Sequence, residues 1–185
     1  MLPPEITLAG PADRARIVES LVAAFRIDPV LRYLFPEEET YPAHAAAFFG
    51  HLFDKRVHRR SIWTVGGEAV AIWEPPSGEP SGEPPAQPDL PPDAAARMER
   101  YDRAVHAALP EAPFWYLGVL GTAPASAGRG WGRAVMAAGL QRAAADGLPA
   151  VLETSTPGNV EFYRRAGWRV VHEVTAPVHV WIMQQ

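Results

Sequence analysis

The sequence has 185 residues, of which 48% are hydrophobic, so it is long enough for one domain with an apolar core and too short to favour two. Its formal net charge of −4 gives no general attraction to nucleic acid or to an anionic membrane, and the absence of cysteine excludes disulfides, thiolate metal sites and cysteine nucleophiles. With no signal sequence and no apolar run of membrane-spanning length, we expect residues 1–185 to form a single cytoplasmic domain, as a monomer or a homodimer.

The N-terminal part predicts a strand followed by two helices. Residues 5–9 are typical of a strand that Gly10-Pro11 ends, and Asp13 is placed to cap the next helix. Apolar residues then recur at helical spacing until Asp28-Pro29, where the proline disfavours helical geometry in the residue before it. Residues 30–35 predict a short helical turn.

A longer helix and a β-hairpin are predicted next. The helix runs from Pro42 to about Arg59, and its basic end opposes the helix dipole. The hairpin consists of two predicted strands, residues 61–65 and 69–73, joined by a turn at Gly66-Gly67.

A proline-rich segment interrupts the chain after the hairpin. Residues 75–92 contain a tandem Ser-Gly-Glu-Pro and many prolines, which deny hydrogen bonding to a helix or a sheet, so we expect a surface loop. Asp93 is then placed to cap a helix that extends to about Leu109, and Pro110 closes it.

The next segment runs from a strand through a glycine-rich turn into a helix. Residues 114–120 are aromatic and branched, as in a buried strand, and helical spacing further on continues to Asp146-Gly147. Gly128, Gly130 and Gly132 lie where the turn becomes the helix, so backbone N–H groups and the positive end of the helix dipole converge there. We therefore expect an anion to bind at this point.

Other glycine motifs fit this turn less well. A mononucleotide P-loop needs GxxxxGK followed by Ser or Thr, and the sequence has no such string. A dinucleotide fingerprint needs GxGxxG, but counting from Gly128 puts Arg133 in the last place, and counting from Gly130 puts Val135 there. Glu153 imitates the ribose carboxylate of that motif, yet too little chain follows it to complete a doubly wound sheet. An ordinary glycine-rich turn is the remaining alternative.

The C-terminal part predicts three more strands. Residues 150–154 are apolar, and a strand, a helix and a strand in succession predict a parallel pair with a right-handed crossover, which binds ligands at the carboxyl ends of its strands. Residues 168–174 and 178–183 are expected to form the last two strands.

The glycine turn resembles the acetyl-coenzyme A signature of the GCN5-related N-acetyltransferase (GNAT) superfamily, Gln/Arg-x-x-Gly-x-Gly/Ala after a strand that ends Leu-Gly-Val-x-Pro. Here the two strings are Ala127-Gly128-Arg129-Gly130-Trp131-Gly132 and Leu120-Gly121-Thr122-Ala123-Pro124. Ala127 departs from the pattern. Because backbone donors hold most of the pyrophosphate, this departure should weaken the site rather than abolish it.

The segment from Asn159 to Trp168 is similar to a second motif of the superfamily, near the end of its domain. The segment contains Tyr163, and Trp168 stands after Gly167 in place of the usual Phe. Together with Leu152-Glu153-Thr154-Ser155 and Trp115-Tyr116-Leu117, it is most similar to the puromycin N-acetyltransferase-like branch. The superfamily implies an α/β fold with a mixed central sheet of about six to seven strands, flanked by helices. Its two central parallel strands splay apart to admit the acetyl-pantetheine arm.

The resemblance implies roles for individual residues. Tyr163 matches the general acid that protonates the leaving thiolate, and Glu153 is our candidate for binding or deprotonating the amine. Each residue also has a purely structural alternative: Tyr163 as a core aromatic residue, and Glu153 as the acceptor of a hydrogen bond from the following turn. Coenzyme binding is assigned to Leu120, Gly121, Thr122, Ala127, Gly128, Arg129, Gly130, Trp131, Gly132 and Asn159. The candidates for the wall of the acceptor pocket are Phe25, Asp28, Tyr33, Trp115 and Tyr116.

These patterns predict an N-acetyltransferase that uses acetyl-CoA as cosubstrate. The primary amine of a small molecule is expected to attack the thioester directly. The alternatives are a non-catalytic acyl-CoA-binding module and an enzyme that acetylates a protein or peptide amine. We expect no metal, because His44, His51 and His58 recur at intervals of seven residues, wider than the one-turn spacing of a metal pair. The identity of the acceptor stays open.

Overall fold

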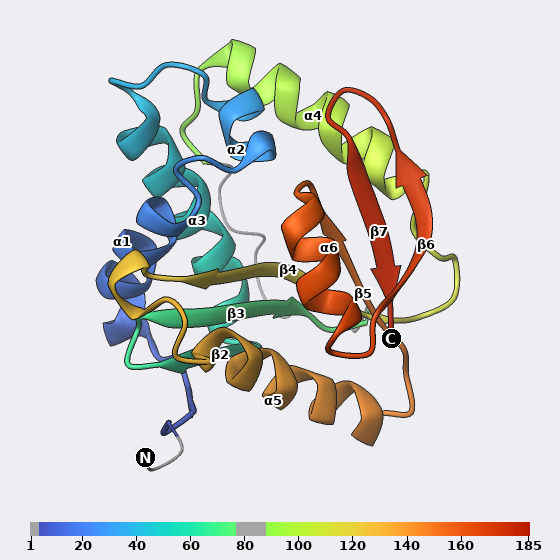
Figure 1. The fold of residues 1–185 in the computed structure, drawn as a ribbon. Coiled ribbons are helices and arrows are strands. Elements are labelled where there is room, and N and C mark those ends of the chain that lie inside the picture. Colours follow the sequence, from blue (N-terminus) through green and yellow to red (C-terminus); the bar gives the residue numbers. More distant parts are fainter. Residues whose placement is uncertain (1–3, 77–87) are drawn as a thin grey trace.

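The computed structural model describes residues 4–76 and 88–185, and within these ranges it contains a single mixed sheet of seven strands with helices on both faces (Figure 1). The strands are β1 (Thr7–Leu8), β2 (Ile62–Val65), β3 (Ala69–Glu74), β4 (Trp115–Thr122), β5 (Ala150–Thr154), β6 (Arg169–Val174) and β7 (Val180–Gln184), in the order β1-β2-β3-β4-β5-β7-β6. The helices are α1 (Arg14–Ala24), α2 (Pro29–Leu34), α3 (Tyr41–Val57), α4 (Pro92–His106), α5 (Trp131–Ala145) and α6 (Pro157–Arg164). Each sheet neighbour is antiparallel except β4 and β5, so the predicted fold class is confirmed.

The central parallel strands separate along their length. β4 and β5 pair only where Trp115–Leu117 lies beside Ala150–Leu152. Beyond that point β4 pairs only with β3, while Glu153 and Thr154 of β5 pair only with β7. The backbone edges that face each other across the gap therefore have free hydrogen-bonding groups at the carboxyl ends of both strands.

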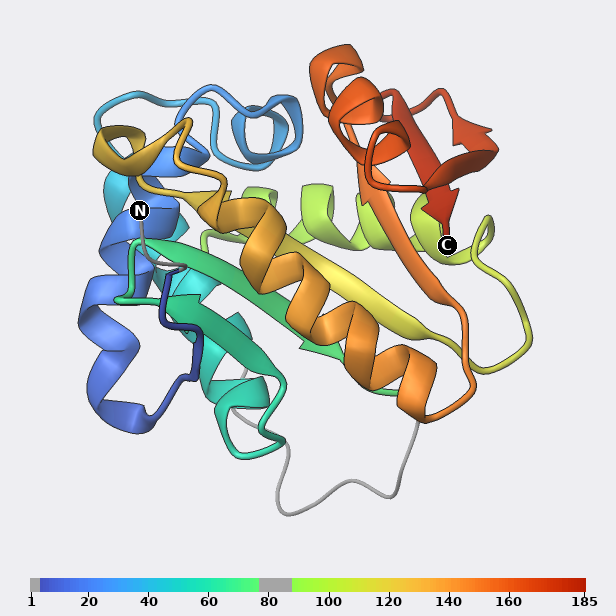
Figure 2. The same cartoon turned by 60° about the horizontal axis from the view of Figure 1, so that its bottom comes forward.

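Different helices cover the two faces of the sheet. In Figure 2, α5 runs across one face, over β2, β3 and β4. Helices α1 and α3 pack on the other face, where α1 contacts β4 and α3 contacts β3. Helix α4 extends that second layer, because its Tyr101 and Val105 pack with Val151 of β5 and Ile182 of β7.

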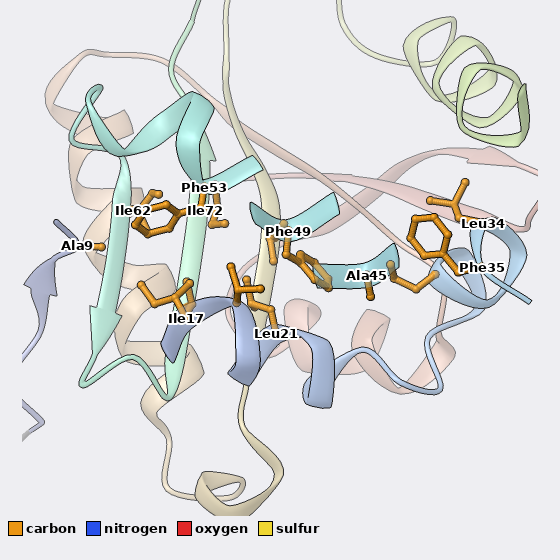
Figure 3. Close-up of a cluster of buried hydrophobic side chains, with 14 of the residues drawn as sticks. Ala9, Ile17, Leu21, Leu34, Phe35, Ala45, Phe49, Phe53, Ile62 and Ile72 are labelled. Carbon is orange, nitrogen blue, oxygen red and sulfur yellow. The ribbon is translucent and has the colours of Figure 1, made fainter. Parts of the chain in front are cut away.

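The core beneath α1 and α3 follows from the helical spacing of their apolar residues. Ile17 and Leu21 from α1 meet Phe49 and Phe53 from α3, above Ile62 and Ile72 of the hairpin (Figure 3). All of these side chains are buried. Leu34 and Phe35, at the end of α2, join the same cluster, which ties α2 to the N-terminal half of the sheet.

Helix α5 approaches the opposite face closely at Gly139. A Cβ atom at this position would lie 2.2 Å from Nε1 of Trp73, which is far inside van der Waals contact. Gly139 therefore lets α5 rest on the indole of β3, and this contact fixes the height of the helix above the sheet.

Several predicted boundaries were wrong. Helix α1 ends at Ala24 rather than at Asp28, because Asp28 caps the next helix instead of ending the first. Helix α4 begins at Pro92, so Asp93 lies in its first turn and pairs with Arg97 rather than capping it, and the helix ends at His106 rather than Leu109. The first strand is shorter than predicted, Thr7–Leu8.

Most of the predicted proline-rich loop, residues 75–92, lies outside the described residues. Among the helices of residues 4–76 and 88–185, none is long and apolar enough to cross a membrane.

Candidate functional site

The glycine turn leads directly into α5, as the sequence predicts. Gly128 and Gly130 have φ angles of 78° and 77°, a region that side-chain-bearing residues adopt only with strain. A Cβ atom at either position would meet nothing within 4 Å, so the space in front of the turn is open. The first N–H groups of α5 have no intrahelical acceptor and carry the positive end of the helix dipole. This turn can therefore cradle a phosphate.

The turn is held from the β2–β3 hairpin. The Ser126 hydroxyl and the Arg16 guanidinium both donate to the Glu68 carboxylate, and the Ala123 N–H donates to the Glu68 carbonyl over 2.7 Å. At the exposed side of the turn, the guanidinium carbon of Arg129 lies 4.9 Å from the ring centroid of Trp131. The turn thus has a fixed backbone and an exposed cation, which both favour an anion.

The residues at the end of β4 lie in three different environments. Leu120 lines a large cleft. Gly121 is buried against α1, where a Cβ atom would come within 2.7 Å of Leu21 and 2.9 Å of Phe25, so its missing side chain serves packing. Thr122 lies beside the start of α5, with its hydroxyl 3.1 Å from the position of a Cβ at Gly132.

The cleft has a volume of about 1160 Å³ and lies on the face of the sheet that carries α1, α3 and α4, at the gap between β4 and β5. Seven phenylalanine and tyrosine side chains contribute to its wall: Phe25, Phe48, Phe49, Tyr101, Phe114, Tyr116 and Tyr163. Five carboxyl groups do so as well: Asp28, Glu74, Asp102, Glu111 and Glu153. Two cations, Lys55 and Arg56, also line the cleft, and Arg56 pairs with Glu74. The cleft therefore combines apolar surface with an excess of carboxyl groups over basic groups.

Glu153 lies at the end of β5, half-buried in this cleft. Both of its carboxylate oxygens accept a hydrogen bond from a tyrosine: Tyr116 donates to Oε2, and Tyr101 donates to Oε1 over 3.4 Å. Burial raises the pKa of Glu153 to about 7, although the bond from Tyr101 opposes that shift by favouring the ionised form. Glu153 can therefore both accept and release a proton near neutral pH.

Tyr163, from α6, lines the same cleft as Glu153. Its ring packs edge-to-face against Trp168, with 5.9 Å between the ring centroids, and only 7% of the residue is exposed. Burial, together with the charges of Glu153 and Asp28, raises the pKa of its hydroxyl well above the ordinary value, so the hydroxyl stays protonated. Within the described part of the chain, no hydrogen-bond partner holds this hydroxyl.

Asp28 also lines the cleft, but its oxygens already have partners. Oδ1 accepts the N–H groups of Val30 and Leu31 at 2.9 and 3.0 Å, which caps α2, and Oδ2 accepts the Ser155 hydroxyl at 3.1 Å. Burial raises the pKa of Asp28 despite these donors. Asp28 thus links the start of α2 to the turn that follows β5.

Two predicted acceptor residues lie elsewhere. Trp115 points toward α5, where its Nε1 donates to Asp146 over 2.9 Å, and it lines a separate hollow of about 420 Å³. Alternation along the strand explains this, since Trp115 and Tyr116 must face opposite sides of the sheet. Tyr33, on α2, packs against the hydrophobic core, and it does not belong to the lining of the cleft.

Two polar residues of the cleft that contact predicted site residues were missed by the sequence analysis. Tyr101 lies on the apolar face of the helix predicted after Asp93, but its polar tip reaches Glu153. Ser155 was noted only as part of a motif, and it bonds to Asp28, 127 positions away. A tyrosine on an otherwise apolar helical face was the only signal for the first, and none existed for the second.

Asn159 is exposed in the first turn of α6 and lines the cleft, as do Phe25, Asp28 and Tyr116. Ala127, Gly128, Arg129 and Gly130 are exposed in the turn.

In residues 4–76 and 88–185, no group of three or more His, Asp or Glu side chains is arranged to hold a metal ion.

Comparison with known proteins shows what this chain is similar to. Residues 94–168 match the profile described as the acetyltransferase (GNAT) family. A crystal structure of a "histone acetyltransferase HPA2 and related acetyltransferase" from Corynebacterium glutamicum is similar with a TM-score of 0.73 and 23% identity, over 99% of this chain and 96% of that one.

Two further structures share the fold at lower identity. The C-terminal condensation domain of Ebony in complex with beta-alanyl-dopamine has a TM-score of 0.73 and 13% identity, over 100% of this chain and 99% of that one. A mosquito arylalkylamine N-acetyltransferase like 5b has a TM-score of 0.61 and 9% identity, over 99% of both chains. The profile match covers the turn, the separated strands and α6, and the three structures share the fold of the whole chain.

Proposed function

We propose that the chain is an acetyl-CoA-dependent N-acetyltransferase that acts on the primary amine of a small, cationic molecule. One observation carries the proposal: Glu153 and Tyr163, a carboxylate with a pKa of about 7 and an unpartnered tyrosine hydroxyl, line one cleft at the gap between β4 and β5. An acceptor for one proton and a donor for another are the two groups that amine acetylation needs.

The residues present fit acetyl-CoA. The open turn at Gly128 and Gly130 suits its pyrophosphate, and the free backbone edges of β4 and β5 suit an extended arm with amide groups. Asn159, at the start of α6, lies where a polar side chain can reach that arm from the cleft. When bound, acetyl-CoA supplies the acetyl group as a thioester, which is already activated for transfer.

The proton transfers belong to the chain. A primary amine is an ammonium ion at neutral pH, and it must lose one proton before its nitrogen can attack. Glu153 accepts that proton, directly or through a water molecule. As the carbon–nitrogen bond forms and the carbon–sulfur bond breaks, the nitrogen loses its second proton to solvent and the Tyr163 hydroxyl donates a proton to the sulfur. Tyr163 then regains a proton from solvent.

Charge and shape favour a cationic amine with an apolar body. Asp28, Asp102 and Glu153 lie in a wall that is rich in aromatic rings. The carboxyl groups of this wall outnumber its two cations, Lys55 and Arg56, so an ammonium group is attracted and an additional carboxylate is repelled. Two proteins that share the fold are described with ligands or substrates of this kind, beta-alanyl-dopamine and arylalkylamines. The resemblance to the puromycin N-acetyltransferase-like branch is a second line of support for a small-molecule acceptor.

The test measures thiol release from acetyl-CoA with a matched pair of amines. We expect 2-phenylethylamine to be acetylated much faster than phenylalanine, which adds a carboxylate to the same body, and faster than a lysine-containing peptide. The rate with 2-phenylethylamine should rise with pH through about 7, as Glu153 ionises. Thiol release from none of these amines would count against the proposal, and release with the peptide alone would favour a protein acceptor.

Glu153→Gln tests the role of the carboxylate. The change keeps the shape of the side chain but removes the proton acceptor, so kcat should fall by about 10²-fold or more at pH 7, and the rise through pH 7 should disappear. The affinity for acetyl-CoA, measured by calorimetry, should not change. A variant with wild-type kcat would return Glu153 to a structural role.

A further inference from the structure

Helix α4 is an excursion between two neighbouring strands. β3 and β4 are adjacent and antiparallel, with Glu74 beside Tyr116, so a few residues would suffice to connect them. β4 instead begins only after α4, which lies above β3 and β4 in Figure 1. One side chain from this excursion, Tyr101, reaches the carboxylate of Glu153.

Both ends of α4 are anchored, so Tyr101 has little freedom. At the start of the helix, the Arg97 guanidinium donates to the Leu34 carbonyl through Nε over 3.1 Å and through Nη2 over 2.8 Å. Further along the helix, Val105 packs with Val151 and Ile182 of the sheet. Tyr101 lies between these anchors, and only 7% of it is exposed.

These contacts close a ring around the cleft. The start of α2 is tied to the end of β5 by Asp28 and Ser155, and the end of α2 is tied to α4 by Leu34 and Arg97. Tyr101 then ties α4 back to β5 at Glu153. Every link is a hydrogen bond, and the last one ends on the carboxylate that the proposed reaction needs.

We propose that Tyr101 is a positioning residue, which together with Tyr116 holds the Glu153 carboxylate toward the cleft with one oxygen bound to each hydroxyl. This inference rests on the proposed function, because it assumes that Glu153 accepts the proton of the amine. Tyr116 is fixed by the sheet itself, whereas Tyr101 arrives only through α4. The excursion is therefore part of the catalytic apparatus as well as a wall of the cleft.

The ionisation of Glu153 is the readout that separates positioning from simple packing. The groups that face Glu153 come from four elements: Asp28 at the start of α2, Tyr101 and Asp102 on α4, Tyr116 on β4 and Tyr163 on α6. The two aspartates disfavour the ionised carboxylate, and the Tyr101 hydroxyl favours it. Losing the Tyr101 hydroxyl must therefore move the ionisation of Glu153 to higher pH.

The experiment compares Tyr101→Phe with wild type in the pH dependence of kcat/KM for 2-phenylethylamine. We expect the acid limb to move up by about half to one pH unit, which gives a loss of roughly threefold to tenfold below pH 7 that recovers at high pH. The matched control is Tyr41→Phe, which also removes a buried hydroxyl with one hydrogen bond, from Tyr41 to the Val22 carbonyl at 3.2 Å, outside the cleft. Its acid limb should stay in place.

A double variant makes the test independent of overall stability. If Tyr101 acts through Glu153, then Tyr101→Phe should cause no further loss in a Glu153→Gln background. An unchanged acid limb, or equal losses in both backgrounds, would overturn the positioning role, provided that Glu153→Gln itself is impaired. If Glu153→Gln retains wild-type activity, the proposed function fails and this inference falls with it, so the two failures are distinguishable.

Discussion

The two sides of the candidate site are built in different ways. The phosphate end of the proposed coenzyme site is one stretch of six residues, 127–132, whose backbone conformation depends on two glycines with positive φ. The acceptor side is a set of side chains from α2, α3, α4, β4, β5 and α6, brought together only by the fold. A backbone site binds what every acyl-CoA carries, whereas a side-chain site can select one acceptor.

This difference predicts how each side responds to substitution. A substitution in the turn should alter the affinity for acetyl-CoA by the same factor whichever acceptor amine is present. A change in the cleft should alter kcat or acceptor preference and leave coenzyme affinity as it is. The following variants test that separation.

Gly130→Asp should have the largest effect. It places a carboxylate in front of an anion site and forces a side-chain-bearing residue to φ 77°, so acetyl-CoA affinity should fall by about a hundredfold or more in calorimetry. Gly147→Asp is the matched control, because Gly147 has φ 68° and open space at the other end of the same helix. It carries the same backbone cost and should bind acetyl-CoA normally. Unchanged affinity in Gly130→Asp would remove the coenzyme assignment.

Tyr163→Phe should have an intermediate effect, confined to the chemical step. The ring and its contact with Trp168 remain, so acetyl-CoA affinity should hold while kcat falls roughly tenfold to a hundredfold at pH 7. The loss should shrink toward about pH 8.5, where a thiolate no longer needs the proton. Tyr41→Phe serves again as the control, and it should keep its kcat. A variant whose acetyl-CoA affinity falls while kcat holds would contradict the division between the two sides.

Ala127→Gln should have the smallest effect. Ala127 is exposed where the family usually carries a polar side chain, and one added hydrogen bond would tighten acetyl-CoA by about 0.5–1.5 kcal/mol, or roughly twofold to tenfold. Ala125→Gln, on an exposed residue of the preceding turn, is the control and should change nothing. Equal binding in both variants would mean that the turn already satisfies the coenzyme by backbone alone.

The same division explains what the sequence could predict. Gly128, Gly130 and the strand before them are local signals, because a positive φ and a helix start are set by residues next to one another. The hairpin and the parallel pair were predictable for the same reason. Their spacing in the chain is enough to fix their pairing.

The acceptor side was predicted only in part, because its residues meet through tertiary packing. Trp115 and Tyr116 are neighbours in sequence but lie on opposite faces of β4, and the sequence analysis assigned both to the pocket. Asp28 lines the cleft, yet its main contacts, a helix cap and a bond to Ser155, depend on where α2 meets β5. No local pattern around Tyr101 indicates that its hydroxyl meets a carboxylate 52 positions away.

The placement of α4 between two adjacent antiparallel strands has a consequence for how this fold can diverge. Because β3 and β4 are paired directly with one another, the segment between them can change in length and sequence without moving the strand that carries Leu120 or the turn that follows it. Evolution can therefore exchange the part of the proposed acceptor wall that α4 contributes while the proposed acetyl donor side is inherited unchanged. Grafting the segment between Glu74 and Trp115 from one relative to another is the corresponding route to altered amine specificity in the laboratory.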